Sequence, residues 1–169
     1  ALLYLDEGKP DLAYGQIDAL LDDNPLASEA LYARALVSAR ARSDYIGLTT
    51  LEQIPVEDRS ADHEQLQNQL WRRYQLSRVE QMMQRGDRNN AAALAERIRT
   101  QAGDQAHARM VHASALAVTG QTGAAIEAAR EALALEPAPA VGLQLEYASV
   151  LLQAGESDTL DEMLARLES

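Results

Sequence analysis

Few residues of this chain have the type and spacing that enzyme chemistry requires. There is no cysteine, which excludes thiolate nucleophiles, thiolate metal sites and disulfides. The sequence also lacks a Gly-x-Ser-x-Gly turn and a His-Glu-x-x-His pair, and the stretch from Gly120 to Gly123 has neither the lysine nor the length of a phosphate-binding loop. We therefore expect no catalytic residue, no bound cofactor and no enzyme activity.

The titratable residues give little support for a metal site. His107 and His112 are five residues apart, which turns their side chains about 140° from one another on a helix and prevents them from sharing a metal ion. We expect both histidines on a helix surface or in a groove. Adjacent acids, such as Asp22 and Asp23, are typical of a solvated helix end. The sequence thus predicts no metal.

The basic residues gather in one stretch that also contains aromatic rings. Trp71 and Tyr74 lie among arginines at five positions, namely Arg72, Arg73, Arg78, Arg85 and Arg88. Rings beside planar guanidinium groups can hold a sugar chain or an acidic peptide. Alternatively, the rings belong to a hydrophobic core and the arginines form its solvated face, which is the interpretation that we favour.

Composition restricts the fold and the partners. The chain has 169 residues, of which 47% are hydrophobic, and it contains no phenylalanine. Alanine and leucine, which favour helices, are far more frequent than β-branched residues. The formal net charge of −11 opposes binding to nucleic acid, and no apolar run approaches the ~18 residues that a membrane-spanning helix needs. We expect an all-α protein that binds no nucleic acid and has no membrane span.

An internal repeat organises the helices. Five positions, which we call the turn positions, recur 34, 44, 34 and 35 residues apart: Gly8, Arg42, Gly86, Gly120 and Gly155. Small or apolar residues follow at fixed offsets, for example Ala125, Ala129 and Ala132 after Gly120. A period near 34 is that of tetratricopeptide repeats, in which each unit is a helix, a tight turn and an antiparallel helix. The sequence therefore predicts a tetratricopeptide-repeat, right-handed superhelical solenoid of antiparallel helix hairpins.

This frame predicts the positions of the helices and of some contacts. Helices are expected at residues 1–7, 10–23, 28–41, 44–54, 60–85, 89–101, 105–118, 122–135, 140–153 and 157–168. Ser28, Ser60 and Asp104 are predicted N-caps, because each precedes a helical run and carries a side-chain oxygen. Ala113 and Ala125 are predicted close contacts between the two helices of one hairpin.

The longest predicted helix, at 60–85, results from the single spacing of 44 residues. Leu66 and Leu70 lie on one arc of this helix and Val79 and Met83 on the opposite arc, so the apolar stripe changes sides midway. We therefore regard the helix as a junction. The predicted organisation is a first repeat segment at 1–55, a long junction helix at 56–85 and a second repeat segment at 86–169, all within one repeat domain excised from a longer protein.

Solenoids of this type bind partners on a concave face that is lined by the first helix of each pair. Counting from the turn positions places a mixed set of apolar, acidic and basic residues on that face: Tyr32, Leu36, Arg40, Arg73, Glu80, Arg85, His107, Met110 and Glu146. We regard these residues as the candidate partner-binding groove.

A family resemblance lies in the stretch around the junction. It begins with Leu48, Leu51, Ile54 and Pro55, continues through Leu66 and Gln67, and ends with the glycine at 86 and the alanine-rich helix after it. This progression resembles the periplasmic tetratricopeptide-repeat region of the C component of bacterial cellulose synthase, an outer-membrane exopolysaccharide export protein. The resemblance implies a non-catalytic periplasmic scaffold that links an inner-membrane synthase to an outer-membrane barrel in cellulose export.

The resemblance also implies partners. These are the proteins of the secretion and synthase complex, and a glucan chain is a further candidate. The alternative hypothesis is a general tetratricopeptide-repeat adaptor that binds a peptide or protein partner in its concave groove.

Overall fold

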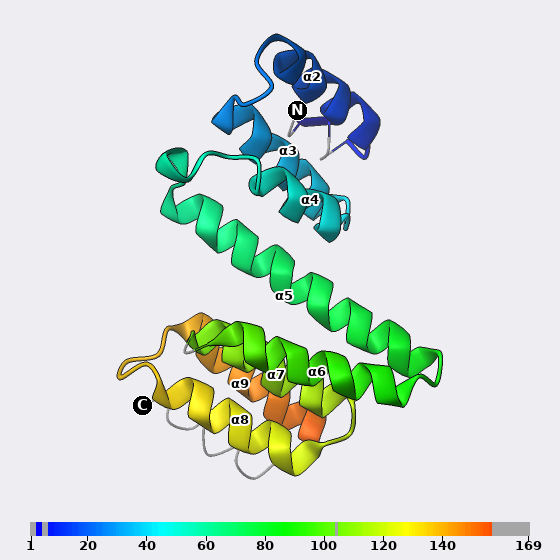
Figure 1. The fold of residues 1–169 in the computed structure, drawn as a ribbon, viewed down its shortest axis with the longest axis vertical. Coiled ribbons are helices and arrows are strands. Elements are labelled where there is room, and N and C mark those ends of the chain that lie inside the picture. The colour runs from blue at the N-terminus through cyan, green and yellow to red at the C-terminus, as the bar shows by residue number, and fades with distance from the viewer. Residues whose placement is uncertain (1–2, 5–6, 104, 157–169) are drawn as a thin grey trace. The chain divides into compact units, whose positions relative to one another are not determined.

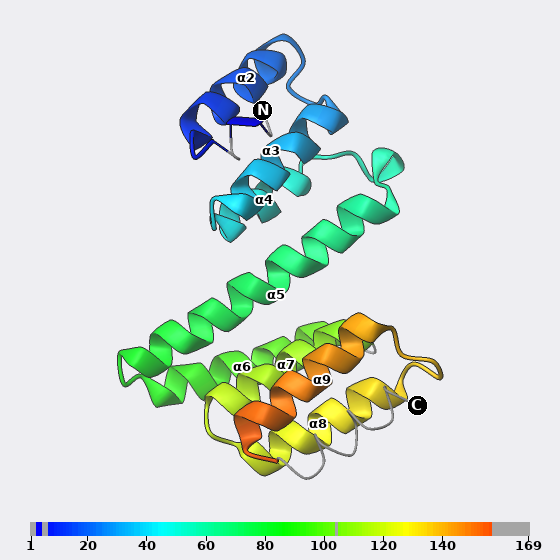
Figure 2. The ribbon, with the colours of Figure 1, turned by 180° about the vertical axis from the view of Figure 1, so that it is seen from behind.

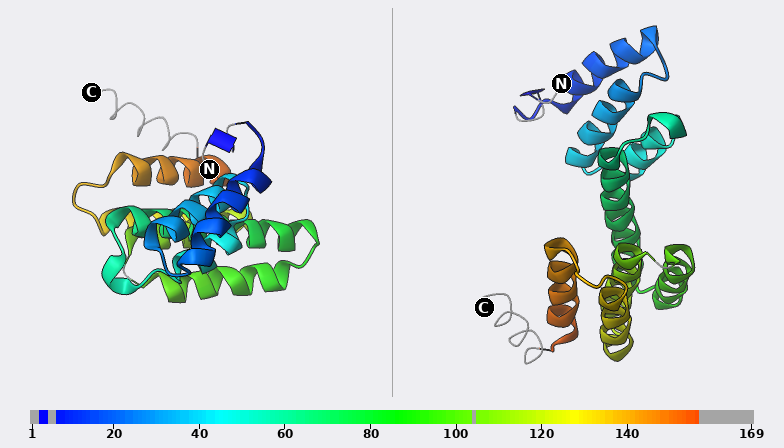
Figure 3. Two further views of the ribbon diagram at one scale, coloured as in Figure 1. Left: turned by 90° about the horizontal axis from the view of Figure 1, so that it is seen from above. Right: turned by 90° about the vertical axis from the view of Figure 1, so that its left-hand side faces the viewer.

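The computed structural model describes residues 3–4, 7–103 and 105–156, and in these residues the fold is all-helical (Figure 1). Its elements are α2 (Pro10–Asp23), α3 (Ser28–Arg40), α4 (Asp44–Leu51), the 3-10 helix η1 (Val56–Asp58), α5 (Ala61–Gln84), α6 (Arg88–Ala102), α7 (Ala106–Val118), α8 (Thr122–Ala134) and α9 (Val141–Ala154). No described residue lies in a strand, and further views of the ribbon show helices joined by turns and short loops (Figure 3).

The bounds of α2 to α9 agree with the sequence-based prediction to within three residues. The largest difference is at the end of α4, which stops at Leu51. Pro55 follows closely, and a proline disfavours helical backbone in the residue before it. The predicted helices at 1–7 and 157–168 lie mostly or wholly outside the described residues. The all-α class is confirmed, and the right-handed superhelical stacking stays a prediction.

The five turn positions share one backbone geometry. Each has a positive φ: 72° at Gly8, 58° at Arg42, 77° at Gly86, 81° at Gly120 and 79° at Gly155. At each turn, the amide of the following residue donates a hydrogen bond to the carbonyl oxygen four residues before the turn position, at 2.7–3.0 Å. This is the Schellman closure of a helix C-terminus. The predicted turns are therefore confirmed at all five positions.

The first of two compact units spans Ala1–Tyr74. It contains α2, α3, α4, η1 and the first part of α5, with α3 in contact with both α2 and α4. Its core includes Ile17, Leu31, Ile54 and Leu70, each 2% exposed or less. A short polar chain lies beside this core, because the Tyr14 hydroxyl donates to Ser38 Oγ at 3.0 Å and Ser38 Oγ donates to the Arg34 carbonyl.

The second unit spans Gln75–Ser169 and is built around α7. This helix contacts α6, α8 and α9, and α8 also contacts α9 (Figure 2). Alanine fills the space between neighbouring helices: Ala91 and Ala95 of α6, Ala113 of α7 and Ala125 of α8 are all fully buried. The burial of Ala113 and Ala125, on two helices that contact one another, agrees with their predicted role in helix packing.

The boundary between the units falls within α5, which is 24 residues long. Leu66 and Leu70 of its first part are buried in the core of the first unit. Val79 of its second part is fully buried in the second unit. Buried residues of α5 therefore lie on both sides of this boundary, and the role of the helix as a junction stays a prediction. The division of the chain at residues 55 and 86 stays a prediction.

Candidate binding surfaces

Arg73 joins three elements of the first unit. Its guanidinium donates to both carboxylate oxygens of Asp44, at the start of α4, and to the carbonyl oxygen of Ala39 in α3 at 2.8 Å. The side chains of Arg73 and Asp44 are only 23% and 13% exposed. A forked, charge-assisted contact of this kind fixes geometry as well as adding energy. Arg73, a predicted groove residue, therefore serves first as a link between helices.

Two pairs of ring-bearing side chains are in contact in the first unit. Tyr32 of the predicted groove meets His63 edge to face, with ring centroids 4.6 Å apart. Tyr45 of α4 and Tyr74 of α5 form a tilted pair with centroids 5.6 Å apart and ring planes at 35°. Tyr74 and Trp71 are half-buried against the core, which agrees with the interpretation of these rings as part of a core.

Tyr45 was not among the candidate residues predicted from the sequence. In the structure its side chain is 60% exposed and thus accessible to a partner. Its partner Tyr74 lies 29 residues further along the chain, so only the packing of α4 on α5 brings them together. The sequence signal that could have identified Tyr45 is an aromatic residue in the first turn of a predicted helix.

The other predicted groove residues of the first unit lie along α3. Tyr32 and Leu36 are half-buried and pack partly against the core, and Arg40 is exposed at the end of the helix. Leu36 and Tyr32 are four residues apart and therefore share a face of α3. This part of the predicted groove offers a partner two partly covered apolar side chains and one basic group.

In the second unit, the predicted residues differ in accessibility. His107 of α7 and Glu146 of α9 are brought together, with His107 Nδ1 3.9 Å from a Glu146 carboxylate oxygen, and their side chains are 51% and 19% exposed. Glu80 and Arg85 are exposed. Met110 is fully buried and belongs to the core, so its side chain gives a partner no surface. The reason is that α7 is covered by helices on several sides, which a count from the turn positions does not include.

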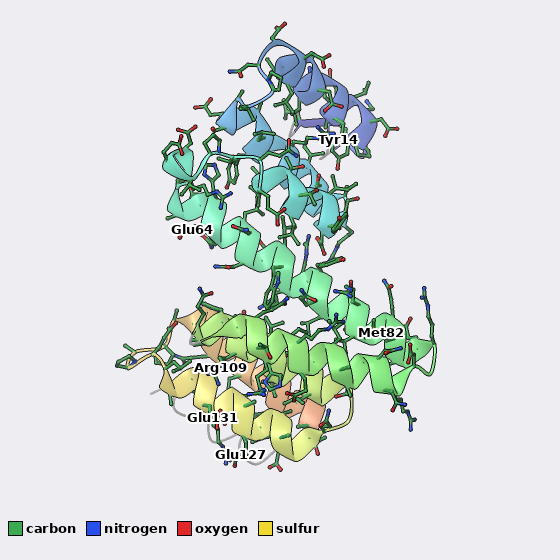
Figure 4. The ribbon with its side chains drawn as sticks, viewed as in Figure 1. Tyr14, Glu64, Met82, Arg109, Glu127 and Glu131 are labelled. Atoms are coloured by element: carbon green, nitrogen blue, oxygen red, sulfur yellow. The ribbon has the colours of Figure 1, made fainter. Side chains whose placement is uncertain are left out.

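His112 corrects an expectation from the sequence, because it is buried rather than on a helix surface. Its Nε2 lies 3.9 Å from a carboxylate oxygen of Glu96 on α6. Burial lowers the pKa of His112 below its ordinary value; Arg99 and Arg109 lower it further, whereas Glu96 and Glu131 oppose the shift. Arg109 on α7 and Glu131 on α8 are labelled in Figure 4. A neutral imidazole is therefore favoured in the folded unit.

The described residues offer little to a metal ion. Among them, no group of three or more histidine, aspartate or glutamate residues has the arrangement of a metal site. His107 and His112 have separate partners, Glu146 and Glu96. In the same part of the chain, no helix combines the length and the apolar character needed to cross a bilayer.

The described helices, joined by one recurring turn geometry and packed through alanine, place this chain in the all-α class. The chain is 32% identical, over all of its length, to a protein named Cellulose synthase operon protein C from Xanthomonas axonopodis pv. citri, strain 306. It is 29% identical, over 99% of its length, to the protein of the same name from Pseudomonas fluorescens, strain SBW25. The resemblance seen around the junction thus extends over the whole chain.

This similarity concerns a minor part of the relatives. The chain spans 11% of the Xanthomonas protein and 13% of the Pseudomonas protein. No protein-family profile matches the chain, and no solved structure is significantly similar to it.

Proposed function

We propose that this chain is part of a non-catalytic tetratricopeptide-repeat scaffold for cellulose export, located in the periplasm between an inner-membrane synthase and an outer-membrane barrel. The observation that carries the proposal is the similarity of the whole chain to two proteins named Cellulose synthase operon protein C. Five turns with one closure support the repeat class, because three of their four spacings are 34 or 35 residues.

The chemistry of the surface supports a scaffold more than an enzyme. Arg73 and Asp44, the least exposed ion pair described above, link two helices and have no arrangement typical of a catalytic pair. Exposed residues of both charges, such as Glu80 and Arg85, remain on the first helix of a predicted repeat. Mixed charges and half-buried apolar groups suit protein partners, which we take to be components of the synthase and secretion complex.

The test uses the full-length protein in a cellulose-producing bacterium. Deleting the region that corresponds to residues 1–169 should abolish cellulose secretion and the co-purification of the synthase. The double variant Glu80→Arg with Arg85→Glu, which reverses two exposed groove charges, should weaken co-purification, whereas Arg97→Glu on the exposed side of α6 should not. Normal secretion after the deletion would contradict the proposal.

The location and the absence of catalysis are tested separately. The tagged full-length protein should have residues 1–169 accessible to protease only after the outer membrane is permeabilised. The purified chain should not hydrolyse cello-oligosaccharides; turnover that a single carboxylate substitution abolishes would show an enzyme instead.

The alternative of a peptide-binding adaptor is favoured by one observation. His107 and Glu146 come from the first helices of successive predicted hairpins and lie together at a partly exposed position. A donor and an acceptor at this spacing suit the backbone of an extended peptide. If His107→Ala and Glu146→Gln abolish capture of a peptide partner but leave cellulose secretion unchanged, the adaptor function is the better description.

A further inference from the structure

The ring pair Tyr45–Tyr74 is unusual among the aromatic residues of the first unit, because one ring is exposed and packs against a second ring that is half-buried. Tyr45 is 60% exposed, and Tyr74 is half-buried against the core. The ring centroids are 5.6 Å apart and the planes are tilted by 35°. The inner ring therefore rests on the core and the outer ring presents aromatic surface to solvent.

The pair is held in place by the ion pair next to it in sequence. Asp44 precedes Tyr45, Arg73 precedes Tyr74, and the Arg73 guanidinium binds Asp44 and the carbonyl oxygen of Ala39. Both ring-bearing backbones are thus fixed by the same contact. A surface that is ordered before a ligand arrives avoids part of the entropic cost of binding.

An exposed basic residue lies close to Tyr45 in the sequence. Arg42 lies in the turn between α3 and α4, three residues before Tyr45, and is exposed. Guanidinium groups donate several hydrogen bonds in a plane, and a tyrosine carries a hydroxyl at the tip of an apolar ring. An exposed ring with a guanidinium group three residues earlier in the chain suits a ligand that has flat apolar faces and hydroxyl groups around its edge.

A β-linked glucan has this chemistry. The hydroxyl groups of a β-glucose ring are equatorial, so its two faces carry only C–H groups, and the β-1,4 linkage keeps successive rings extended. The net charge of −11 opposes binding of an acidic polymer but not of a neutral one. Building on the proposed function, we infer that Tyr45 and Tyr74 form a stacking platform for a β-linked glucan chain.

The test titrates the purified 169-residue chain with cellohexaose and follows backbone amide chemical shifts. We expect saturable shifts centred on Tyr45, Tyr74 and the turn between α3 and α4. Maltohexaose, the α-linked hexamer of the same sugar, is the matched ligand and should bind at least about fivefold more weakly, because its curved chain presents fewer coplanar rings. Equal binding of the two hexamers, or no binding of cellohexaose, would overturn the inference.

Three variants locate the site. Tyr45→Ala should weaken cellohexaose binding about tenfold because the outer ring is lost, whereas Tyr45→Phe should retain most of the affinity. Ile46→Ala removes the neighbouring, 48% exposed aliphatic side chain and should have no effect. An unchanged affinity of Tyr45→Ala, with helical content and thermal midpoint equal to those of the wild type, would place the glucan elsewhere and overturn the assignment.

The result separates this inference from the scaffold proposal. Failure of glucan binding with normal co-purification of the synthase would remove the platform and leave the scaffold. Glucan binding without any association with the synthase would support the platform and contradict the scaffold proposal. A stronger chemical-shift response to an acidic hexapeptide than to cellohexaose would identify the rings as a peptide site and contradict the inference.

Discussion

The α3–α4 hairpin of the first unit and the α7–α8 hairpin of the second unit build the same turn from different residues. The first turn has Arg42 at φ 58° and the second has Gly120 at φ 81°, yet both close with the same hydrogen bond at 2.9 Å. Five residues later, the first hairpin has Gly47 and the second has Ala125. The first hairpin therefore has its glycine at the helix interface, whereas the second has its glycine in the turn. The two hairpins share the backbone geometry of the turn and a small residue at the interface, although the residue types differ.

The largest expected effect comes from filling the interface at Gly47. A Cβ at this position would lie 2.8 Å from Leu70 Cδ1 and 3.4 Å from the Ala35 carbonyl oxygen. Gly47→Leu should therefore lower the free energy of unfolding by about 3 kcal/mol through overpacking, measured by urea denaturation. Gly15→Leu is the matched control, because a Cβ at Gly15 meets nothing within 4 Å. Equal midpoints for the two variants would show that close approach at Gly47 is not required.

The corresponding change in the second unit should have a smaller effect. Ala113 and Ala125 are fully buried, and enlarging either to leucine should destabilise the unit by roughly 1–3 kcal/mol. Ala124→Leu, at the neighbouring exposed position, provides the control and should change little. If both buried variants unfold at the wild-type urea concentration, the assigned helix faces are wrong.

Replacing the turn residues should change the stability of the two hairpins in opposite directions. Gly120→Ala should cost about 1 kcal/mol, because a Cβ there meets no atom within 4 Å and only the left-handed backbone is penalised. Arg42→Gly should relieve the same penalty and stabilise the first unit by up to about 1 kcal/mol, reduced by the greater freedom of glycine in the unfolded chain. Thermal midpoints that shift in the same direction would contradict a shared turn geometry.

The smallest effect concerns pH and only the second unit. The pKa of His112 is lowered in the folded chain, chiefly by burial, so the unfolded chain binds a proton first as the pH falls below about 6.5. Stability should therefore decrease from pH 7.5 to pH 5. His112→Gln should show a shallower decrease over this range. A steeper or identical profile for His112→Gln would exclude this histidine as the cause.

The repeat frame could be predicted from the sequence because its signals are local. Glycine favours positive φ, and the regular spacing extended the prediction to Arg42, where the residue type alone would not suggest a left-handed backbone. Helix bounds followed from the same frame. Small residues at fixed offsets likewise identified the buried alanines, such as Ala125 and Ala129.

The candidate sites were harder to predict because they depend on contacts between distant residues. Ser28 does not cap α3, whose N-cap is Ala27; its hydroxyl donates instead to Asp58, 30 residues away. The predicted cap Asp104 lies outside the described residues. Met110 was placed on a groove and is buried, and Tyr45 gains its significance only from the packing of α5 beside α4. Periodicity gives the face of a helix but not the number of neighbours that cover it.

The closure of every turn within six residues also has a consequence for folding kinetics. A hydrogen bond from the residue after the turn position to a carbonyl five residues earlier forms without bringing distant parts of the chain together. Most helices of the second unit likewise contact their neighbours in sequence. Chains with such short sequence separations pay little loop-closure entropy before native contacts form, and they fold on time scales of about microseconds to milliseconds. Each hairpin can thus form soon after its own residues become available, before the rest of the chain is present.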